Sequence, residues 1–180
     1  MPDQTTFSDT VAPIAIRDGF RAAISQAVET FGATAPNPSV GCALLDAEGR
    51  VLTVGVHPRA GQPHAEAMAL AQARAAGVLD QARVALVTLE PCNHTGRTPP
   101  CSEALRNSPV REVWIGAADP NPQASGGADR LREEPGAKRV VMLADRPHMA
   151  DLARECRALL APFASRVVRH RPWISVKQAL

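Results

Sequence analysis

One histidine, one glutamate and two cysteines stand at spacings that could form a hydrolytic metal site. His64 and Glu66 are two residues apart, and Cys92 and Cys101 follow later in the chain. Zn²⁺ favours nitrogen and thiolate ligands, and a catalytic zinc site keeps its fourth position open for water. With His64, Cys92 and Cys101 as ligands, Glu66 would remain free to move protons. The pattern therefore predicts zinc as the cofactor and Glu66 as the catalytic acid and base.

Secondary structure must bring these residues to one place. The helix expected over residues 65–76 carries Glu66 in its first turn. The apolar run 84–89 is typical of a strand buried on both faces, and Cys92 falls just past its end. Ligand sites in open α/β sheets gather at the carboxyl ends of strands. A pair of prolines directly before Cys101 predicts that a second ligand-bearing helix begins there.

Strands and helices alternate along the rest of the chain. Further helices are expected over 18–31, around Leu131 and over 149–160, and strands over 40–45, 51–56, 110–116, 139–143 and 166–177. The first two strands flank a short acidic turn and predict an antiparallel hairpin. Together the elements predict an α/β fold, a three-layer α/β/α sandwich with a mixed central sheet of about five strands. Residues 1–17 show no period and predict a flexible N-terminal arm before a catalytic domain over 18–165.

The amino-acid composition indicates which kinds of binding partner to expect. The 180 residues are 45% hydrophobic and 21% charged, with a net charge of +2, which is ordinary globular usage and demands neither a nucleic-acid nor a membrane partner. Aromatic residues are only 3% and tyrosine is absent. Single-stranded nucleic acids are usually held by stacking aromatics, so the scarcity favours a small-molecule ligand. No apolar run approaches the roughly 20 residues that a spanning helix needs.

The four cysteines are interpreted together with the cellular compartment that the sequence predicts. The chain opens without the basic and apolar run of a secretory signal, so we expect a reducing, cytoplasmic setting. In that setting Cys92 and Cys101 indicate metal binding rather than a disulfide. Cys42 and Cys156 lie in apolar patterns and are expected to be small core residues.

Two residues leave alternatives open. His94 is the only nearby candidate for a fourth zinc ligand, which would make the site a structural zinc knot. Asn37 stands between two prolines that hold the backbone out of a helix. Its amide could face a ligand, or it could merely satisfy a turn.

Several short motifs resemble one family, the N-terminal pyrimidine deaminase domain of the bacterial bifunctional riboflavin-biosynthesis deaminase/reductase, in the cytidine-deaminase-like superfamily. The motifs are residues 36–42, His57 with 59–61, 63–66, 88–92, the eight-residue insert before Cys101, and 119–122. The resemblance runs from about residue 18 to the end. Cytidine-deaminase relatives have Cys-x-x-Cys, so the longer spacing between Cys92 and Cys101 singles out this branch.

The resemblance implies a function and a pocket. The family removes the 2-amino group from 2,5-diamino-6-ribosylamino-4(3H)-pyrimidinone 5′-phosphate by hydrolysis. By similarity, His64, Cys92 and Cys101 bind zinc and Glu66 shuttles protons. The positions that match the family's substrate pocket are Asn37, His57, His94, Arg97, Asp119 and Asn121. An arginine in a glycine-bearing loop can fork onto a phosphate, which is the role expected of Arg97.

Other readings stay open at this point. His57 and His94 could be surface loop histidines. The chain could deaminate another base, such as guanine, cytidine or a tRNA adenosine. It could also be a non-catalytic zinc scaffold that pairs with a separate reductase. Homo-oligomerisation is likewise left open.

Three departures from the family pattern matter. Asn93 replaces the usual serine beside the first cysteine, and residues 124–138 diverge from the usual helix. Residues 171–177 resemble the entry into the family's reductase domain, and the sequence stops soon after. We therefore expect 166–180 to be the start of a missing or truncated reductase domain, and deamination without NADPH-dependent reduction.

Overall fold

The centre of the molecule is a five-stranded mixed sheet. The structure, a computed structural model, describes residues 11–95 and 99–174. The strands are β1 (Gly41–Leu45), β2 (Val51–Val56), β3 (Val84–Val87), β4 (Glu112–Ile115) and β5 (Arg139–Met142), in the order β2-β1-β3-β4-β5. β1 pairs antiparallel with both β2 and β3, whereas β3, β4 and β5 are parallel. The predicted mixed sheet and its hairpin are confirmed.

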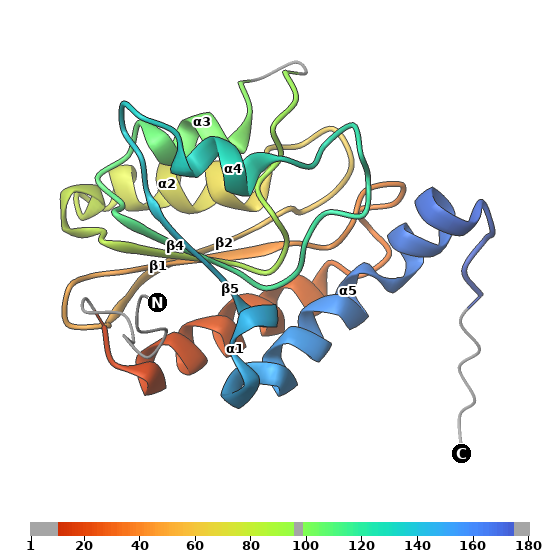
Figure 1. Cartoon of the computed structure of the whole chain (residues 1–180), viewed down its shortest axis with the longest axis horizontal. Helices are drawn as coiled ribbons and strands as arrows, with labels where there is room; N and C mark the ends of the chain where they lie inside the picture. Colours follow the sequence, from red (N-terminus) through yellow and green to blue (C-terminus); the bar gives the residue numbers. More distant parts are fainter. Residues whose placement is uncertain (1–10, 96–98, 175–180) are drawn as a thin grey trace, which may run out of the picture.

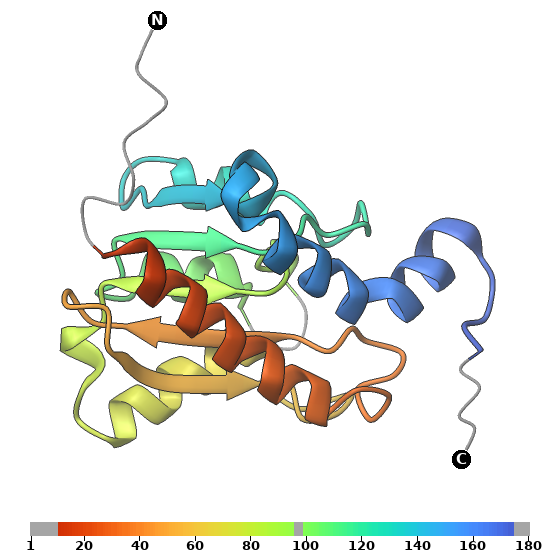
Figure 2. The ribbon, with the colours of Figure 1, turned by 90° about the horizontal axis from the view of Figure 1, so that it is seen from below.

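Helices cover both faces of this sheet. They are α1 (Pro13–Glu29), α2 (Ala65–Ala75), α3 (Cys101–Arg106), α4 (Gly127–Arg132) and α5 (Ala150–Arg169), with 3₁₀ turns at Leu79–Gln81, Leu143–Asp145 and Pro147–Met149. Figure 1 shows α1 and α5 on one face and α2, α3 and α4 on the other. The view from below in Figure 2 shows α1 and α5 lying side by side across the strands. This is the predicted three-layer α/β/α sandwich.

Burial explains which strands are central. Every residue of β1, β3 and β4 is buried, as expected of central strands that helices cover on both faces. β2 and β5 form the edges and are partly exposed. α1 buries Ile16, Phe20 and Ala23 against the sheet, at the three- and four-residue steps that its sequence shows. The two expected core cysteines, Cys42 and Cys156, are buried.

A glycine in β2 seats the helix that carries the metal-site residues. A Cβ atom added at Gly55 would lie 2.3 Å from the carbonyl oxygen of Ala65 and 2.3 Å from the amide nitrogen of Ala69. Only a residue without a side chain allows the backbone of α2 to approach β2 so closely. The position of the first turn of α2 is therefore fixed against the sheet.

Two expected boundaries fall inside helices. α1 begins at Pro13, so residues 13–17, expected in a flexible arm, are helical; residues 1–10 lie outside the described part. α5 continues to Arg169, so the strand expected from residue 166 is wrong over its first four residues, and 170–174 are irregular. The helical period simply continues past Leu160 through Phe163.

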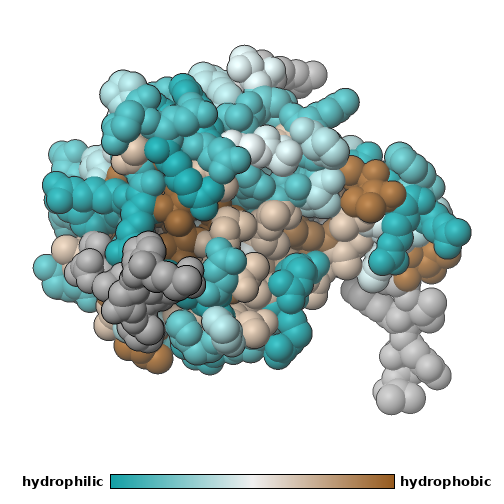
Figure 3. All heavy atoms as spheres, in the orientation of Figure 1, coloured by the Kyte–Doolittle hydropathy of each residue, from teal (hydrophilic) through white to brown (hydrophobic). Residues whose placement is uncertain are grey.

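Hydrophilic side chains cover much of the face seen in Figure 3, and smaller hydrophobic patches appear near its centre and on its projecting part. Among the exposed large hydrophobic residues, Val168 is 59% exposed and Ile174 is 79% exposed. Among the described residues, no helix is long and apolar enough to cross a membrane.

Candidate active site

The candidate residues meet at one edge of the sheet. β2, β3 and β4 all end there, because each runs in the same direction and β1 runs in the opposite one. His57 follows β2, Cys92 follows the end of β3, and Asp119 follows β4. Asn37 reaches the same edge from the segment that enters β1. Loops at the carboxyl ends of strands thus carry the polar groups, as expected for an open α/β sheet.

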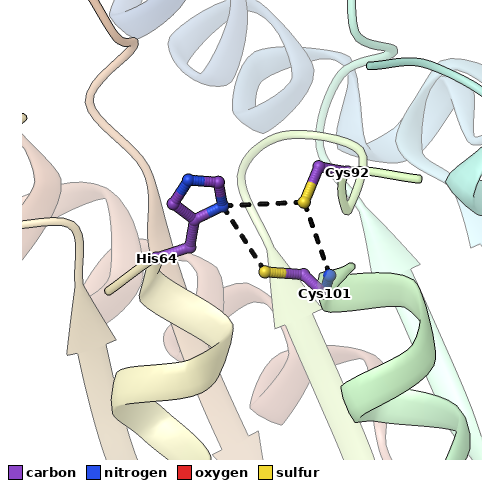
Figure 4. A group of neighbouring side chains, drawn as sticks. All are labelled: His64, Cys92 and Cys101. Carbon is purple, nitrogen blue, oxygen red and sulfur yellow. Dashed lines mark hydrogen bonds between the residues drawn. The ribbon is translucent and has the colours of Figure 1, made fainter. Parts of the chain in front are cut away.

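His64, Cys92 and Cys101 form a compact group, drawn in Figure 4. His64 is the residue directly before α2, and Cys101 is the first residue of α3. Their ligand atoms all lie within 4.8 Å of one another. The Nδ1 atom of His64 is 3.6 Å from the Cys92 sulfur and 3.5 Å from the Cys101 sulfur. Three residues from separate segments therefore converge on one point.

This geometry fits a tetrahedral Zn²⁺ ion. With a Zn–N bond of about 2.05 Å and a Zn–S bond of about 2.3 Å, a tetrahedral centre holds its nitrogen and sulfur ligands about 3.6 Å apart. The two measured separations between His64 Nδ1 and the sulfurs match that value. Two thiolates with one imidazole also make the donor set that zinc prefers. The predicted cofactor thus has a suitable site.

The group leaves one position of a tetrahedron unfilled by protein. Within the part of the chain that the structure describes, no fourth histidine, cysteine or acidic residue joins the three ligand atoms. His94 is exposed and lies in the wall of the adjoining cavity instead. The arrangement therefore favours an open, catalytic type of zinc site over a closed structural knot.

Cys92 is poised to be a thiolate. Hydrogen bonds from Cys101 and His64 lower the pKa of Cys92 to about 4. The backbone N–H of Cys101, at the start of α3, donates to the Cys92 sulfur at 3.4 Å. In turn, the charge on Cys92 and burial raise the pKa of the Cys101 thiol well above its usual range. The pair thus holds one proton, on Cys101, which is released when a metal binds.

Glu66 is buried beside this group. Its side chain is only 3% exposed, in the first turn of α2. Burial raises the pKa of Glu66 to about 7, and the nearby Cys92 thiolate acts in the same direction. A carboxyl group in such surroundings can both take and give a proton near neutral pH.

A cavity of about 250 Å³ opens next to the metal group. Its size suits one small molecule. Eight of the ten residues singled out in the sequence line it: Asn37, His57, His64, Glu66, Cys92, His94, Asp119 and Asn121. Cys101 instead borders a second cavity, between α2 and α3, together with His64. Arg97, the tenth, lies outside the described residues.

A histidine bridge orders one side of the cavity. His57 is buried, and its Nδ1–H donates to the carbonyl oxygen of Pro63 at 3.0 Å. Its Nε2 then accepts from the Asn37 side-chain amide at 3.3 Å. Burial lowers the pKa of His57, which favours the neutral ring that this pairing requires. The bridge links the Asn37 amide to the residue that precedes His64.

Glu90 holds the opposite side. Its carboxylate, 8% exposed, accepts the backbone N–H groups of Asp119 at 3.1 Å, Gly126 at 3.1 Å and Ala128 at 3.0 Å. The Asp119 carboxylate in turn accepts the Asn121 N–H at 2.8 Å. Burial raises the pKa of Asp119. One buried carboxylate therefore fixes the loop that brings two polar side chains to the cavity.

Replacing Glu90 with glutamine is expected to lower the free energy of unfolding by about 1–3 kcal/mol. The amide oxygen can still accept from Gly126 and Ala128, but the amide NH₂ group cannot accept the Asp119 N–H. Urea unfolding monitored by circular dichroism measures the change. The matched control is Glu133→Gln, because Glu133 is exposed and its ion pair with Arg130 lies at the surface. Equal unfolding free energies for the two variants would contradict this role of Glu90.

The two divergent segments also contact the site region. Asn93 accepts a hydrogen bond at 3.1 Å from the hydroxyl of Ser102 in α3, so it links the first cysteine's loop to the second ligand's helix. A Cβ atom at Gly127 would lie 1.7 Å from the Pro91 carbonyl oxygen. The start of α4 therefore packs directly on the backbone next to Cys92, and this position accepts only glycine.

The cavity wall also includes polar and aromatic residues that were not assigned to the site from the sequence, among them Glu90, Phe163 and Arg166. Glu90 stands in a recognised motif, but its contacts are to backbone groups far along the chain. Phe163 and Arg166 come from α5, in a stretch partly expected to be a strand. Continuation of the helical period beyond Leu160 is the signal that could have placed them.

Comparison with known proteins agrees with this site. Residues 17–117 match the family described as the cytidine and deoxycytidylate deaminase zinc-binding region. The chain is 52% identical over 113 residues to the chloroplastic riboflavin biosynthesis protein PYRD of Zea mays, with 62% of this chain and 28% of that protein covered. It is 38% identical over 169 residues to the riboflavin biosynthesis protein RibD of Corynebacterium ammoniagenes, covering 94% of this chain and 46% of that protein.

A solved structure shows the same fold. The diaminohydroxyphosphoribosylaminopyrimidine deaminase/5-amino-6-(5-phosphoribosylamino)uracil reductase of Thermotoga maritima superposes with a TM-score of 0.79 at 34% identity, over 89% of this chain and 43% of that one. The chain thus spans less than half the length of these relatives. On the match of residues 17–117 and the His64, Cys92 and Cys101 group, the chain belongs to the zinc-binding cytidine and deoxycytidylate deaminase family, as a homologue of the deaminase part of bifunctional riboflavin-biosynthesis proteins.

Proposed function

We propose that the chain hydrolytically deaminates 2,5-diamino-6-ribosylamino-4(3H)-pyrimidinone 5′-phosphate, a reaction of riboflavin biosynthesis. The observation that carries the proposal is the buried Glu66, which lines the same small cavity as His64 and Cys92. A proton carrier and an open metal position on one cavity wall are what hydrolysis of a C–N bond needs. The resemblance to riboflavin-biosynthesis proteins supports this pyrimidine as the substrate.

His64, Cys92 and Cys101 would hold the ion, and Glu66 would carry the protons. A Zn²⁺ ion bound there would supply a water molecule whose pKa is lowered to about 7. Glu66 would take one proton from the attacking water as the C–O bond forms at the amine-bearing carbon, and would pass that proton to the ring nitrogen. It would then take the proton left on the new hydroxyl and pass it to the departing amine, so that the C–N bond breaks, the carbonyl forms and ammonia leaves. The exchange of NH₂ for oxygen consumes one water and releases one ammonia.

The remaining predicted residues would position the pyrimidine. The bridge through His57 holds the Asn37 amide in one orientation, which supports a role in reading a ring edge. The Glu90 carboxylate holds the Asp119 backbone, and with it the loop that presents Asp119 and Asn121. His94 lies exposed in the cavity wall, and the phosphate role of Arg97 stays a prediction.

We also propose a reductase as the functional partner. A relative of known structure is named as a deaminase and a reductase in one chain, and this chain covers 43% of it. The product of deamination would then pass to a reducing step, on a following domain or on a separate chain. In this proposal residues 18–165 form the deaminase unit, and α1 and α5 extend a few residues past these bounds.

A substrate panel tests the proposed reaction. We expect the zinc-loaded chain to release ammonia from the diaminopyrimidine riboside phosphate with the highest kcat/KM, because the cavity of about 250 Å³ suits one small molecule and the relatives are named as riboflavin biosynthesis proteins. Cytidine, guanine and an adenosine-containing tRNA are the comparison substrates, measured by coupled detection of ammonia. A higher kcat/KM for any of these three comparison substrates would mean that the proposed substrate is wrong. Release of no ammonia from any of the four substrates would favour a non-catalytic zinc scaffold.

A further inference from the structure

The end of α5 contributes to the cavity from the far end of the sequence. Phe163 and Arg166 line the same cavity as Asn37 and His94. Figures 1 and 2 both show the last turns of α5 projecting beyond the edge of the sheet where β2, β3 and β4 end. Both side chains thus come to the cavity from α5, and we place Arg166, which is exposed, at the outer rim of the cavity.

Arg166 is held in place at this rim by two neutral partners. Its Nη2 atom donates to the carbonyl oxygen of Pro36 at 2.7 Å. Its guanidinium also lies over the ring of Phe163, 5.8 Å from the ring centroid. Neither partner neutralises the positive charge. Within the described residues, no carboxylate forms an ion pair with Arg166.

The guanidinium keeps most of its binding capacity. An arginine side chain has five N–H donors in a planar fork, and Pro36 accepts from one nitrogen only. A planar fork suits a phosphate, which accepts two parallel hydrogen bonds. Contacts to Pro36 and Phe163 already restrict the side chain, so less rotamer entropy would be lost when an anion binds.

Charge within the cavity also favours this position for an anion. Among the described residues that line the cavity, Arg166 is the only arginine or lysine. The inner wall carries carboxyl groups at Glu66, Glu90 and Asp119. An uncharged ring with polar edges suits that inner wall, whereas a phosphate would be repelled from it. The favourable place for a phosphate is the rim.

We propose that Arg166 binds the 5′-phosphate of the substrate at the rim and so selects phosphorylated over unphosphorylated pyrimidine ribosides. The inference rests on the proposed function, because it takes the ring to lie against Glu66. It assigns to the end of α5 a phosphate contact in addition to the one predicted for Arg97.

The experiment compares two substrates in three variants of the zinc-loaded chain. Arg166→Ala is expected to lower kcat/KM for the phosphorylated pyrimidine riboside by about 10- to 100-fold, mainly through KM, because a charge-assisted hydrogen bond is lost. The value for the dephosphorylated riboside should stay within about twofold. Arg166→Lys should restore part of the preference. Arg169→Ala is the matched control, since Arg169 is exposed on the same helix but does not line the cavity.

Two results would overturn the inference. Equal losses for both substrates in Arg166→Ala would mean that Arg166 acts only by tethering Pro36, and unchanged kinetics would mean that it has no role in binding. If the unaltered chain releases no ammonia, the proposed function fails. The role of Arg166 can then still be tested by calorimetric titration, which measures the binding affinity of the same two ribosides. The inference then requires tighter binding of the phosphorylated riboside to the unaltered chain, and loss of that difference in Arg166→Ala.

Discussion

Replacing Glu66 with glutamine is expected to reduce ammonia release by about 1,000-fold while zinc binding is retained, since a positioned acid and base contributes roughly 10²–10⁴-fold. Glutamine has nearly the same shape and fits the buried position, but its amide cannot carry a proton between water and the departing amine. Ammonia release and metal analysis on the same preparation measure the two quantities. The expected result is full zinc occupancy with almost no turnover.

Glu103 offers a closely matched control. It follows Cys101 by two residues in the first turn of α3, as Glu66 follows His64 by two residues in the first turn of α2. The Glu103 carboxylate, however, pairs with Arg130 at 3.1 Å and borders the second cavity. Glu103→Gln should therefore leave turnover within about threefold, because a partly exposed ion pair contributes little. Loss of zinc in Glu66→Gln would instead make Glu66 a ligand, and unchanged turnover would assign proton transfer to another group.

Replacing Cys92 with serine is expected to remove most of the bound zinc and, with it, ammonia release. The substitution removes the Cys92 thiolate. The Cys101 N–H and the His64 ring both lie close to the Cys92 sulfur and stabilise its negative charge. A serine hydroxyl stays protonated at neutral pH and is a poor zinc ligand. We expect zinc content to fall below about one tenth of an equivalent per chain. Metal analysis after gel filtration measures it.

The control variant Cys156→Ala tests whether the loss of zinc is specific to Cys92 or follows from removal of any cysteine thiol. Cys156 is a buried residue of α5 and does not belong to the metal-binding group. Its removal should cost about 1 kcal/mol of unfolding free energy through a small cavity and leave zinc content unchanged. If Cys92→Ser and Cys156→Ala retained the same zinc content, then Cys92 would not be a ligand and the three-residue metal site would be wrong.

The sheet and the metal group are predictable from the sequence because their signals are local. β1 and β3 are short apolar runs and β4 is apolar after Glu112, and such runs can be recognised as strands without knowledge of distant contacts. His64 and Cys101 stand at helix starts that proline and polar residues mark. Because ligand sites in open α/β sheets gather at the carboxyl ends of the strands, the site could then be expected at that edge of the sheet.

The positions of Arg166 at the cavity rim and of Glu90, which supports the cavity wall, are not predictable from local sequence. The contact between Arg166 and Pro36 joins residues 130 apart, and the Glu90 contacts reach residues up to 38 positions away. The alternating pattern expected over 166–177 favours a strand, although residues 166–169 are the last residues of helix α5. A local pattern over so few residues does not decide between a helix and a strand.

Product analysis in heavy-oxygen water tests zinc-dependent hydrolysis at this site. The zinc-loaded chain is incubated with the diaminopyrimidine riboside phosphate, and product mass and free ammonia are measured together. We expect one ammonia for each product molecule, and one heavy oxygen at the carbon that had carried the amine. Zinc fully bound at His64, Cys92 and Cys101 with no ammonia released, or a product without the heavy oxygen, would contradict the proposed reaction.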